Sequence, residues 1–184
     1  MGKHCDIEVL EKKQLDFYWE LKNDPYLKRN YWGDVLKVHS RRELEKEIES
    51  QLKSKEPVKQ YHFLVKNKRG EYAGYIGLNR RYHMEPTLNA MINVLPRKPA
   101  HLRSKALSEA LDWVLAKCFH GLKLHAVAAT PLEINEPYIR FLESGGFQRN
   151  GVTRRVTQHD GKFVGAVLMD ILDREWLESV LHSR

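Results

Sequence analysis

The sequence predicts a single α/β domain with a mixed central β-sheet of about seven strands, flanked by about four helices. Three observations predict this class. Strand-length apolar runs alternate with periodic helical segments over residues 1–184, and no linker rich in Gly, Ser or Pro divides them. A strand, a helix and a second strand follow one another between residues 88 and 130, which indicates a parallel strand pair. Asp160-Gly161 between two further strand candidates indicates a hairpin.

The first half of the chain supplies a strand, a pair of helices and then a run of strands. Residues 4–10 form the first strand, and a helix over residues 12–24 should stop before Pro25, because proline cannot continue a helix. A second helix starts at Ser40, which forms a capping box with Glu43, and it carries an apolar stripe. The stripe consists of Leu44, Ile48 and Leu52. The following strands cover residues 60–67, 72–81 and 88–96.

The second half begins with a helix over residues 101–118 that should face the core, because apolar residues recur along one side of it. These residues are Leu107, Ala110, Leu111, Val114, Leu115 and Cys118. A strand follows within residues 122–130, and the next helix has Asn135 as its N-cap and stops at Gly145 or Gly146. Two strands joined at Asp160-Gly161 complete the sheet.

Composition narrows the class of protein before any motif is considered. The 184 residues contain 42% hydrophobic and 30% charged residues, which is typical of a globular chain. We expect no membrane span and no secretory signal, and therefore a cytoplasmic location. Cys5 and Cys118 lack the spacing of a metal site, so we expect reduced, structural thiols and no metal. The net charge of +7 fits an anionic cofactor, an acidic substrate, a ribosome or nucleic acid, or a role in solubility alone.

The start of the helix at residues 101–118 is unusually basic. Arg103 and Lys105 flank Ser104 there, although the helix dipole already makes this end positive and favours acidic residues. An anion bound at the helix start would explain the cations, because free backbone N–H groups and the dipole attract negative charge. The alternative is a solvated basic patch.

Two stretches, "NEPYIRFLESGGF" and "HDGKFVGAVLMDILDREW", stand in an order and spacing that resembles the GNAT superfamily of acyl-CoA-dependent N-acyltransferases. Among its members, the chain is similar to the ribosomal-protein N-terminal acetyltransferases. The family holds coenzyme A phosphates on a loop of the form Gln/Arg-x-x-Gly-x-Gly/Ala. The matching stretch here is "HLRSKA", in which His101 takes the first position, Ser104 replaces a glycine and Ala106 takes the last position.

The resemblance implies a site for acetyl-CoA. Arg97, Lys98, Arg103 and Lys105 would compensate for the missing glycines with charge-assisted hydrogen bonds to phosphate. The thioester arm would pair with the backbone of the strand "INVLP", where this strand diverges from its neighbour. The full set of expected cofactor-binding residues is Asn93, Val94, Leu95, His101, Arg103, Ser104, Lys105, Ala106 and Asn135.

The catalytic groups depart from the family pattern. The position that often carries a tyrosine acid reads Leu142, and the position of a common glutamate base reads Met91. Tyr138, one turn earlier, is a candidate acid, with a half-buried aromatic anchor as the alternative. The candidates for a general base are His83 and Glu85, together with His125 on the following strand.

The acceptor side of such folds is bordered by the first two helices and their connection. Tyr31 and Trp32 would form an aromatic wall of the substrate site there, or else fill the core. The sequence thus predicts transfer of acetyl from acetyl-CoA to a primary amine, either a protein N-terminus or a small amine, by a monomer or homodimer. The alternative is a catalytically silent GNAT-fold module that binds RNA, a ribosome or an acidic partner through its basic face. A third hypothesis replaces the donor by aminoacyl-tRNA.

Overall fold

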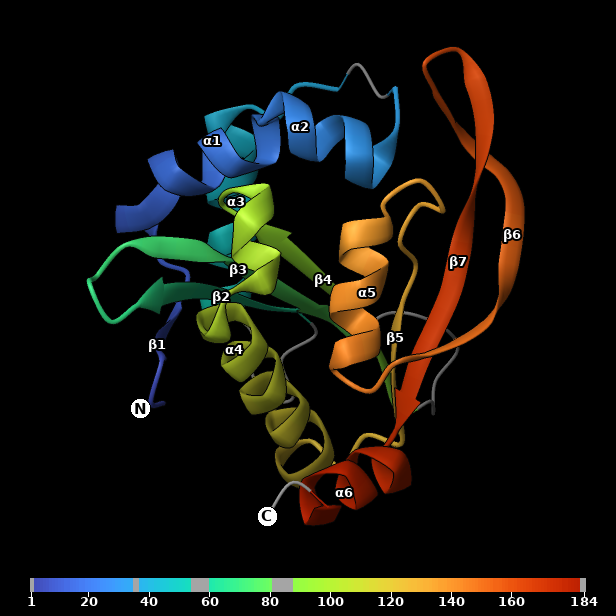
Figure 1. The fold of residues 1–184 in the computed structure, drawn as a ribbon. Coiled ribbons are helices and arrows are strands. Elements are labelled where there is room, and N and C mark those ends of the chain that lie inside the picture. Colours follow the sequence, from blue (N-terminus) through green and yellow to red (C-terminus); the bar gives the residue numbers. More distant parts are fainter. Residues whose placement is uncertain (1, 35–36, 54–59, 81–87, 183–184) are drawn as a thin grey trace.

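The computed structural model describes residues 2–34, 37–53, 60–80 and 88–182 (Figure 1). Within these ranges a single seven-stranded sheet has the order β1-β2-β3-β4-β5-β7-β6. The strands are β1 (Cys5–Val9), β2 (Gln60–Asn67), β3 (Tyr72–Asn79), β4 (Asn89–Pro96), β5 (Ala126–Ala129), β6 (Gln148–His159) and β7 (Lys162–Leu172). Only β4 and β5 pair in parallel, and all other described neighbours are antiparallel. The predicted mixed sheet and its parallel pair are confirmed.

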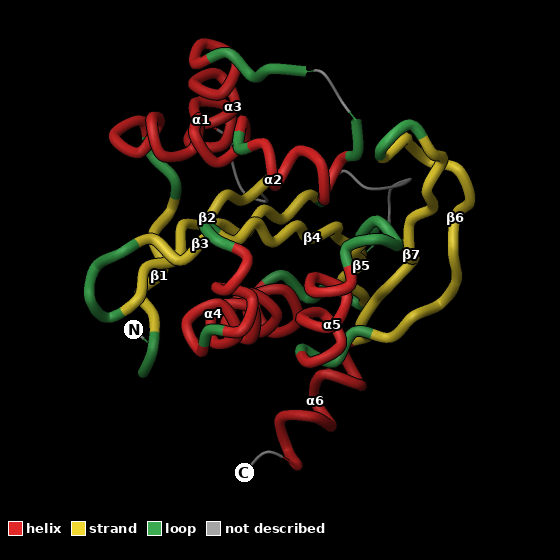
Figure 2. Tube along the Cα trace, turned by 45° about the horizontal axis from the view of Figure 1, so that its top comes forward, coloured by secondary structure: helices red, strands yellow, loops and turns green. Residues whose placement is uncertain are grey.

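Helices cover both faces of this sheet (Figure 2). They are α1 (Leu15–Asn23), α2 (Pro25–Leu27), α3 (Arg41–Lys53), α4 (Lys105–Ala116), α5 (Glu136–Ser144) and α6 (Asp173–His182). Figure 2 shows α1, α2 and α3 on one face, and α4 and α5 on the other. The described ranges thus hold six α-helices instead of about four, because the short α2 and the final α6 were not expected. Among the described residues, no helix combines the length and the apolar character needed to cross a membrane.

Helix α3 shows how a predicted apolar stripe is rotated by packing. The Ser40 hydroxyl accepts a hydrogen bond from the Glu43 N–H at 3.1 Å, as the capping box predicts. Leu44 and Ile48 are fully buried, but Leu52 is 50% exposed. Gln51 is buried in its place, and its side chain accepts a hydrogen bond from the N–H of His62 on β2. Since an α-helix has 3.6 residues per turn, a strict four-residue spacing drifts off the buried face.

Helix α4 carries the predicted apolar face into the core. The residues of that face, Leu107, Ala110, Leu111, Val114, Leu115 and Cys118, are all buried. The α-helix begins at Lys105 and not at residue 101, because Ser104 has the extended conformation of an N-cap, with φ −84° and ψ 141°. The preceding residues form a separate 3₁₀-helix, η3 (Pro99–Arg103). The short helix η3 thus directly precedes α4, and only Ser104 lies between the two.

The β6–β7 hairpin forms one border of the sheet. Strand β6 is exposed along almost its whole length, and its ladder with β7 is irregular between Thr153 and Thr157, where Arg155 has φ +55°. The hairpin is tied to η2, a π-helical turn over Lys28–Trp32, by an ion pair between Arg29 and Asp160. Its position beside η2 matters for the site, because η2 carries both aromatic residues expected at the acceptor side.

Candidate functional site

Strands β4 and β5 part from one another halfway along β4. Their parallel pairing ends at Met91 and Ala128, whereas β4 continues to pair with β3 as far as Pro96. The edge of β4 beyond Met91 therefore faces a gap in the sheet, which we call the β4–β5 splay. Backbone N–H and C=O groups on this edge have no strand to bind, so they are available to a side chain or to a ligand.

The Tyr138 hydroxyl enters the splay and accepts a hydrogen bond from the Val94 N–H at 3.0 Å. Since successive residues of a strand direct their N–H groups to opposite edges, the N–H groups of Asn93 and Leu95 face β3 instead. Of the three predicted lining residues, only Val94 thus directs its N–H into the splay. Burial raises the pKa of Tyr138 above its ordinary value, so the phenol keeps its proton at neutral pH.

Helix α5 positions Tyr138. Asn135 occupies the N-cap of α5 as predicted, but its side chain makes no capping bond. Its amide instead donates to the carbonyl of Asn30 at 3.2 Å, which ties α5 to η2. Asn135 is only 1% exposed, and among the described residues its Oδ1 has no hydrogen-bond partner. Asn135 therefore fixes the start of α5 against η2, and Tyr138 lies in the first turn of this helix.

The loop before α4 is held by side chains that the phosphate-loop comparison assigned to the cofactor. The Ser104 hydroxyl accepts from the Leu107 N–H at 3.3 Å and donates to the His101 carbonyl at 2.7 Å. His101 Nδ1 lies 2.9 Å from the carbonyl of Ala73 on β3, to which it can only donate. Both side chains thus brace the loop. The N–H groups of Lys105 and Ala106 lie in the first helical turn, where backbone donors have no intrahelical acceptor.

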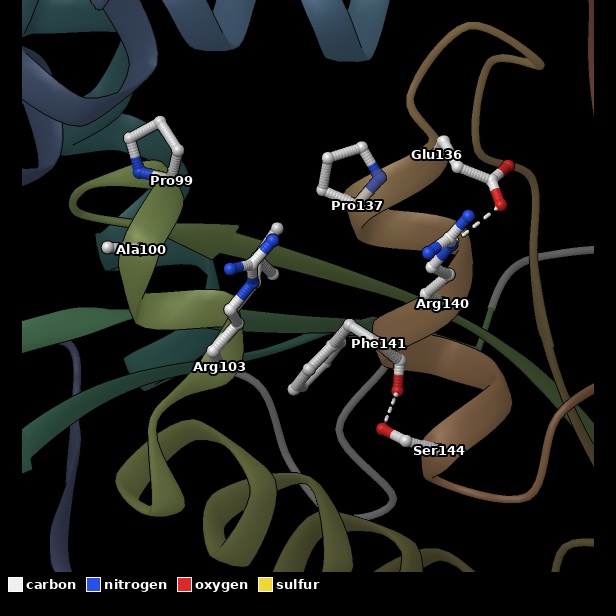
Figure 3. A pocket seen from close by; sticks show the side chains of 9 residues that line it. Pro99, Ala100, Arg103, Glu136, Pro137, Arg140, Phe141 and Ser144 are labelled. Atoms are coloured by element: carbon white, nitrogen blue, oxygen red, sulfur yellow. Dashed lines mark hydrogen bonds and ion pairs between the residues drawn. The ribbon is translucent and has the colours of Figure 1, made fainter.

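A cavity of about 550 Å³ lies between η3 and α5 (Figure 3). Its lining residues are Pro99, Ala100, Leu102, Arg103, Glu136, Pro137, Arg140, Phe141 and Ser144. Arg140 is paired with Glu136 at 2.9 Å, whereas no acidic group of the described chain pairs with Arg103. Figure 3 shows the Arg103 side chain in the space between η3 and α5. The cavity therefore presents one uncompensated guanidinium.

The four predicted phosphate-binding cations differ in their availability. Arg97 forms an ion pair with Glu20 at 3.1 Å, so its charge is already used. Lys98, Arg103 and Lys105 are not buried, and none of them has an ion-pair partner among the described residues. The positive charge at the start of α4 is therefore supplied by these three side chains.

The model of the acetyltransferase (GNAT) domain family matches residues 7–148 of this chain. The chain belongs to this family. No curated protein matches the sequence significantly. The solved structure of a spermidine N-acetyltransferase from Vibrio cholerae, in complex with CoA and spermine, has a TM-score of 0.81 at 19% identity. The likeness covers 96% of this chain and 99% of that chain. A mutant form of the Vibrio cholerae enzyme gives 0.77 at 20% identity, with 97% and 99% covered.

The catalytic candidates of this GNAT protein are distributed unevenly. His83 and Glu85 lie outside the described residues. His125 precedes β5, whereas the splay opens beyond the carboxyl end of the parallel pairing, so His125 lies at the other end of these strands. Its Nδ1 lies 3.3 Å from Asp173. Leu142 is fully buried and offers no acid, so among the described candidates Tyr138 is the titratable side chain found in the splay.

The two aromatic residues of the expected acceptor side play different parts. Tyr31 is buried, and its ring lies 4.8 Å from that of Tyr138. Trp32 is half-buried and lines a second cavity of about 220 Å³. Tyr31 thus belongs to the core beside the splay, and Trp32 to the wall of the second cavity.

Both cysteines of this GNAT protein are free and buried. Burial raises the pKa of the Cys5 and Cys118 thiols to about 12. Since the thiolate is the nucleophile, neither thiol is activated at neutral pH. The prediction of reduced, structural cysteines is confirmed.

Proposed function

We propose that this protein transfers an acetyl group from acetyl-CoA to a primary amine, either a protein N-terminus or a small amine. The observation that carries the proposal is the β4–β5 splay beside a cavity with an unpaired Arg103, in a chain of the GNAT acetyltransferase family. Structural neighbours that are named spermidine N-acetyltransferases support an amine acceptor. The resemblance to the ribosomal-protein branch stays a prediction.

The residues around the cavity fit a phosphorylated co-substrate. Arg103 and Lys105 would bind its diphosphate, together with the first-turn N–H groups of Lys105 and Ala106. Ser104 contributes by capping α4, and its small side chain leaves the helix start accessible. The Val94 carbonyl would pair with the extended arm of the co-substrate along β4, because the Val94 N–H is already bound to Tyr138.

Acetyl-CoA would supply the acetyl group as a thioester. In the transfer, the amine nitrogen forms a bond to the acetyl carbon, the carbon–sulfur bond breaks, and the nitrogen loses a proton while sulfur gains one. Tyr138 is the proposed donor to sulfur. Its oxygen accepts from Val94, so the phenolic proton remains free to be given. His83 and Glu85 remain the candidate bases, and an ordered water can relay the amine proton as well.

Calorimetric titration with acetyl-CoA tests the proposal directly. We expect saturable heat, and release of free thiol when an acceptor amine is added. The absence of heat at millimolar acetyl-CoA would overturn the proposal, and nucleic-acid binding with steep salt dependence would then favour the silent module.

Charge reversal at the start of α4 tests the diphosphate site. Replacing Arg103 and Lys105 together by Glu should weaken acetyl-CoA binding by about tenfold or more, because a hydrogen bond to a charged group contributes about 1.5–3 kcal/mol. Arg42→Glu with Lys46→Glu makes the same charge change on the outer face of α3 and serves as the control. Equal acetyl-CoA affinity in both double variants would show that the cations at α4 do not bind the diphosphate.

A further inference from the structure

The cavity that Trp32 lines is surrounded by positive charge. Its lining residues are Lys22, Lys28, Trp32, Lys37 and His39, and we call it the lysine pocket. They come from α1, from η2 and from the segment after it. None of these described lining residues is acidic. A site that collects three ammonium groups around one aromatic ring is electrostatically suited to an anion.

The ammonium group of Lys22 lies between two aromatic rings. Its Nζ is 5.7 Å from the ring centre of Tyr18 and 5.6 Å from that of Trp32. Neither Lys22 nor Lys28 has an ion-pair partner among the described residues. Burial lowers the pKa of Lys22, and this effect outweighs the attraction of Glu47 and Glu43. An anion in the pocket would add a further negative charge beside this ammonium group.

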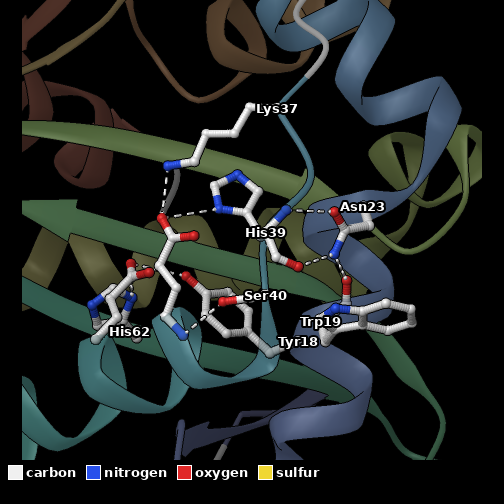
Figure 4. Close-up of polar contacts among 9 residues, drawn as sticks. Tyr18, Trp19, Asn23, Lys37, His39, Ser40 and His62 are labelled. Atoms are coloured by element: carbon white, nitrogen blue, oxygen red, sulfur yellow. Dashed lines mark hydrogen bonds and ion pairs between the residues drawn. The ribbon is translucent and has the colours of Figure 1, made fainter.

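Two carboxylates of α3, Glu43 and Glu47, act on Lys22 and His39 of the pocket, and each also binds another group. Glu43 binds Lys37 at 2.6 Å and lies 3.6 Å from His39 Nδ1 (Figure 4). Glu47 accepts a hydrogen bond from the Tyr18 hydroxyl at 3.0 Å. The three lysines of the pocket therefore exceed these two carboxylates by one positive charge, without counting His39.

The wall that carries His39 is fixed to α1. The Asn23 side chain accepts from the His39 N–H at 2.9 Å and donates to the His39 carbonyl at 3.0 Å (Figure 4). His39 Nδ1 is buried, and no described residue gives it a hydrogen bond. The two hydrogen bonds from Asn23 thus hold the backbone of His39 in place at the wall of the pocket.

The lysine pocket adjoins the β4–β5 splay through aromatic contacts. The ring of Tyr31 lies 6.2 Å from that of Trp32 and 4.8 Å from that of Tyr138, whose hydroxyl binds Val94. The ring of Tyr31 alone thus lies between Trp32 of the pocket and Tyr138, and an acceptor with its anion in the pocket would direct its amine past this ring toward the proposed place of acetyl transfer.

We propose that the lysine pocket binds an anionic group, carboxylate or phosphate, on the acceptor, so that the acceptor is an acidic amine and not a polycation. This inference rests on the proposed acetyl transfer, because that function makes the splay the reacting centre. A polyamine would bring like charges together in the pocket, and such juxtaposition disfavours the wrong partner. The source of the anion is a small acidic amine or an acidic peptide N-terminus.

Direct binding tests the pocket independently of turnover. We expect O-phosphoethanolamine to bind at least tenfold more tightly than ethanolamine in calorimetry, because the two differ only in the phosphate. Lys28→Gln and Lys37→Gln should each remove most of that difference. Lys46→Gln, on the outer face of α3, is the matched control. Equal affinity for the two amines, or unchanged binding in the pocket variants, would overturn the proposal.

Turnover distinguishes the two sources and separates this inference from the proposed function. We expect faster acetylation of O-phosphoethanolamine or 4-aminobutyrate than of spermidine if the acceptor is small, and faster acetylation of a Ser-Glu than of a Ser-Lys peptide if it is a protein terminus.

Lys28→Gln should raise the KM for the acidic acceptor and leave the KM for acetyl-CoA unchanged. Preferred acetylation of spermidine would overturn the acidic acceptor while supporting acetyl transfer. Absence of acetyl-CoA binding would overturn acetyl transfer, and only the anion binding measured by calorimetry would then stand.

Discussion

At the scale of a single residue, Tyr138 links helix α5 to the edge of β4 that faces the splay. Its backbone belongs to α5, its hydroxyl accepts from Val94 on β4, and its ring packs against Tyr31. It is 3% exposed, so it is more deeply buried than the half-buried anchor that the sequence suggested, and it remains the candidate acid. The two interpretations differ in what loss of the hydroxyl does to the rate.

Replacing Tyr138 by Phe should lower kcat about 100-fold or more, because a positioned acid contributes about 10²–10⁴-fold to proton transfer. The variant should also lose about 1–3 kcal/mol of stability, since the Val94 N–H is left without its acceptor. Steady-state thiol release and a denaturant titration measure the two effects. Tyr72→Phe, on the half-buried start of β3, is the control. An unchanged kcat with the expected loss of stability would leave Tyr138 as an anchor only.

A site residue could be predicted from the sequence when its partner lies close to it along the chain. The Ser104 cap was predictable, because its acceptor role involves Leu107 in the same turn. The brace between His101 and Ala73 joins residues 28 positions apart, and no local pattern shows it. The lysine pocket was also missed, because its members share a surface only after α1 and η2 have packed. Its signal was the density of lysines around Trp32 in the stretch already singled out as the acceptor side.

At the scale of the element, α3 shows how helical period sets the buried face. Leu44 and Ile48 are followed on that face by Gln51, which binds the N–H of His62, and Leu52 turns toward solvent. The apolar spacing located the helix correctly. It could not show that a buried hydrogen bond to β2 would select a polar residue for the last turn.

Matched truncations on α3 make this difference measurable. Leu44→Ala should cost about 2–5 kcal/mol of unfolding free energy, because it leaves a cavity in the core. Leu52→Ala removes the same atoms from a half-exposed position and should cost less than about 1 kcal/mol, since little apolar area is lost from the interior. Chemical denaturation of both variants checks the ranking. Equal losses would place Leu52 in the core after all.

The join between η2 and the β6–β7 hairpin depends on Gly33. This glycine has φ +77°, and an added Cβ would meet the Gln158 carbonyl and the Thr157 side chain. Gly33→Ala should therefore destabilise the protein and weaken acceptor binding, because Trp32 precedes it. Gly70→Ala has a similar φ of +79° with nothing within 4 Å, so it isolates the cost of the backbone conformation, about 1–2 kcal/mol. Thermal unfolding compares them, and equal melting temperatures would exclude a close approach at Gly33.

At the scale of the whole molecule, a buried polar cluster couples stability to pH. His62 lies inside the layer between β2 and α3 (Figure 4), with Nδ1 2.7 Å from the Tyr75 hydroxyl. Burial lowers its pKa from the ordinary 6.5, and this effect outweighs the attraction of Glu47, 3.8 Å away. The unfolded chain consequently takes up a proton at a higher pH than the folded chain does.

The free energy of unfolding should therefore be fully retained above pH 6.5 and should fall as the pH drops below that value toward the folded pKa of His62. One such group changes stability by at most about 1.4 kcal/mol per pH unit. Denaturant titrations between pH 5 and pH 8 measure this slope. His62→Asn should flatten it, and His120→Asn at the surface should not. An equal slope in both variants would assign the pH dependence to other groups.

The fold as a whole was predictable from the sequence because its signals are local and mutually consistent. Strand β2 was expected at residues 60–67 and has those bounds, and the hairpin turns at Asp160-Gly161. The divergence of β4 and β5 was known only through the family resemblance. Pairing between strands separated by a helix depends on how that helix packs, and the apolar pattern of β4 does not reveal where the pairing ends.

The first nine of the twelve residues of strand β6, residues 148–156, are exposed at the border of the sheet, and another chain could add a strand there and begin aggregation. Between Thr153 and Thr157 the strand advances four residues while β7 advances two, and Arg155 is turned into the left-handed region. The irregularity interrupts the row of outward backbone groups, and Arg154 and Arg155 add like charges to it. A second chain therefore pairs poorly with this edge, and the irregularity and the two arginines protect the exposed strand from aggregation.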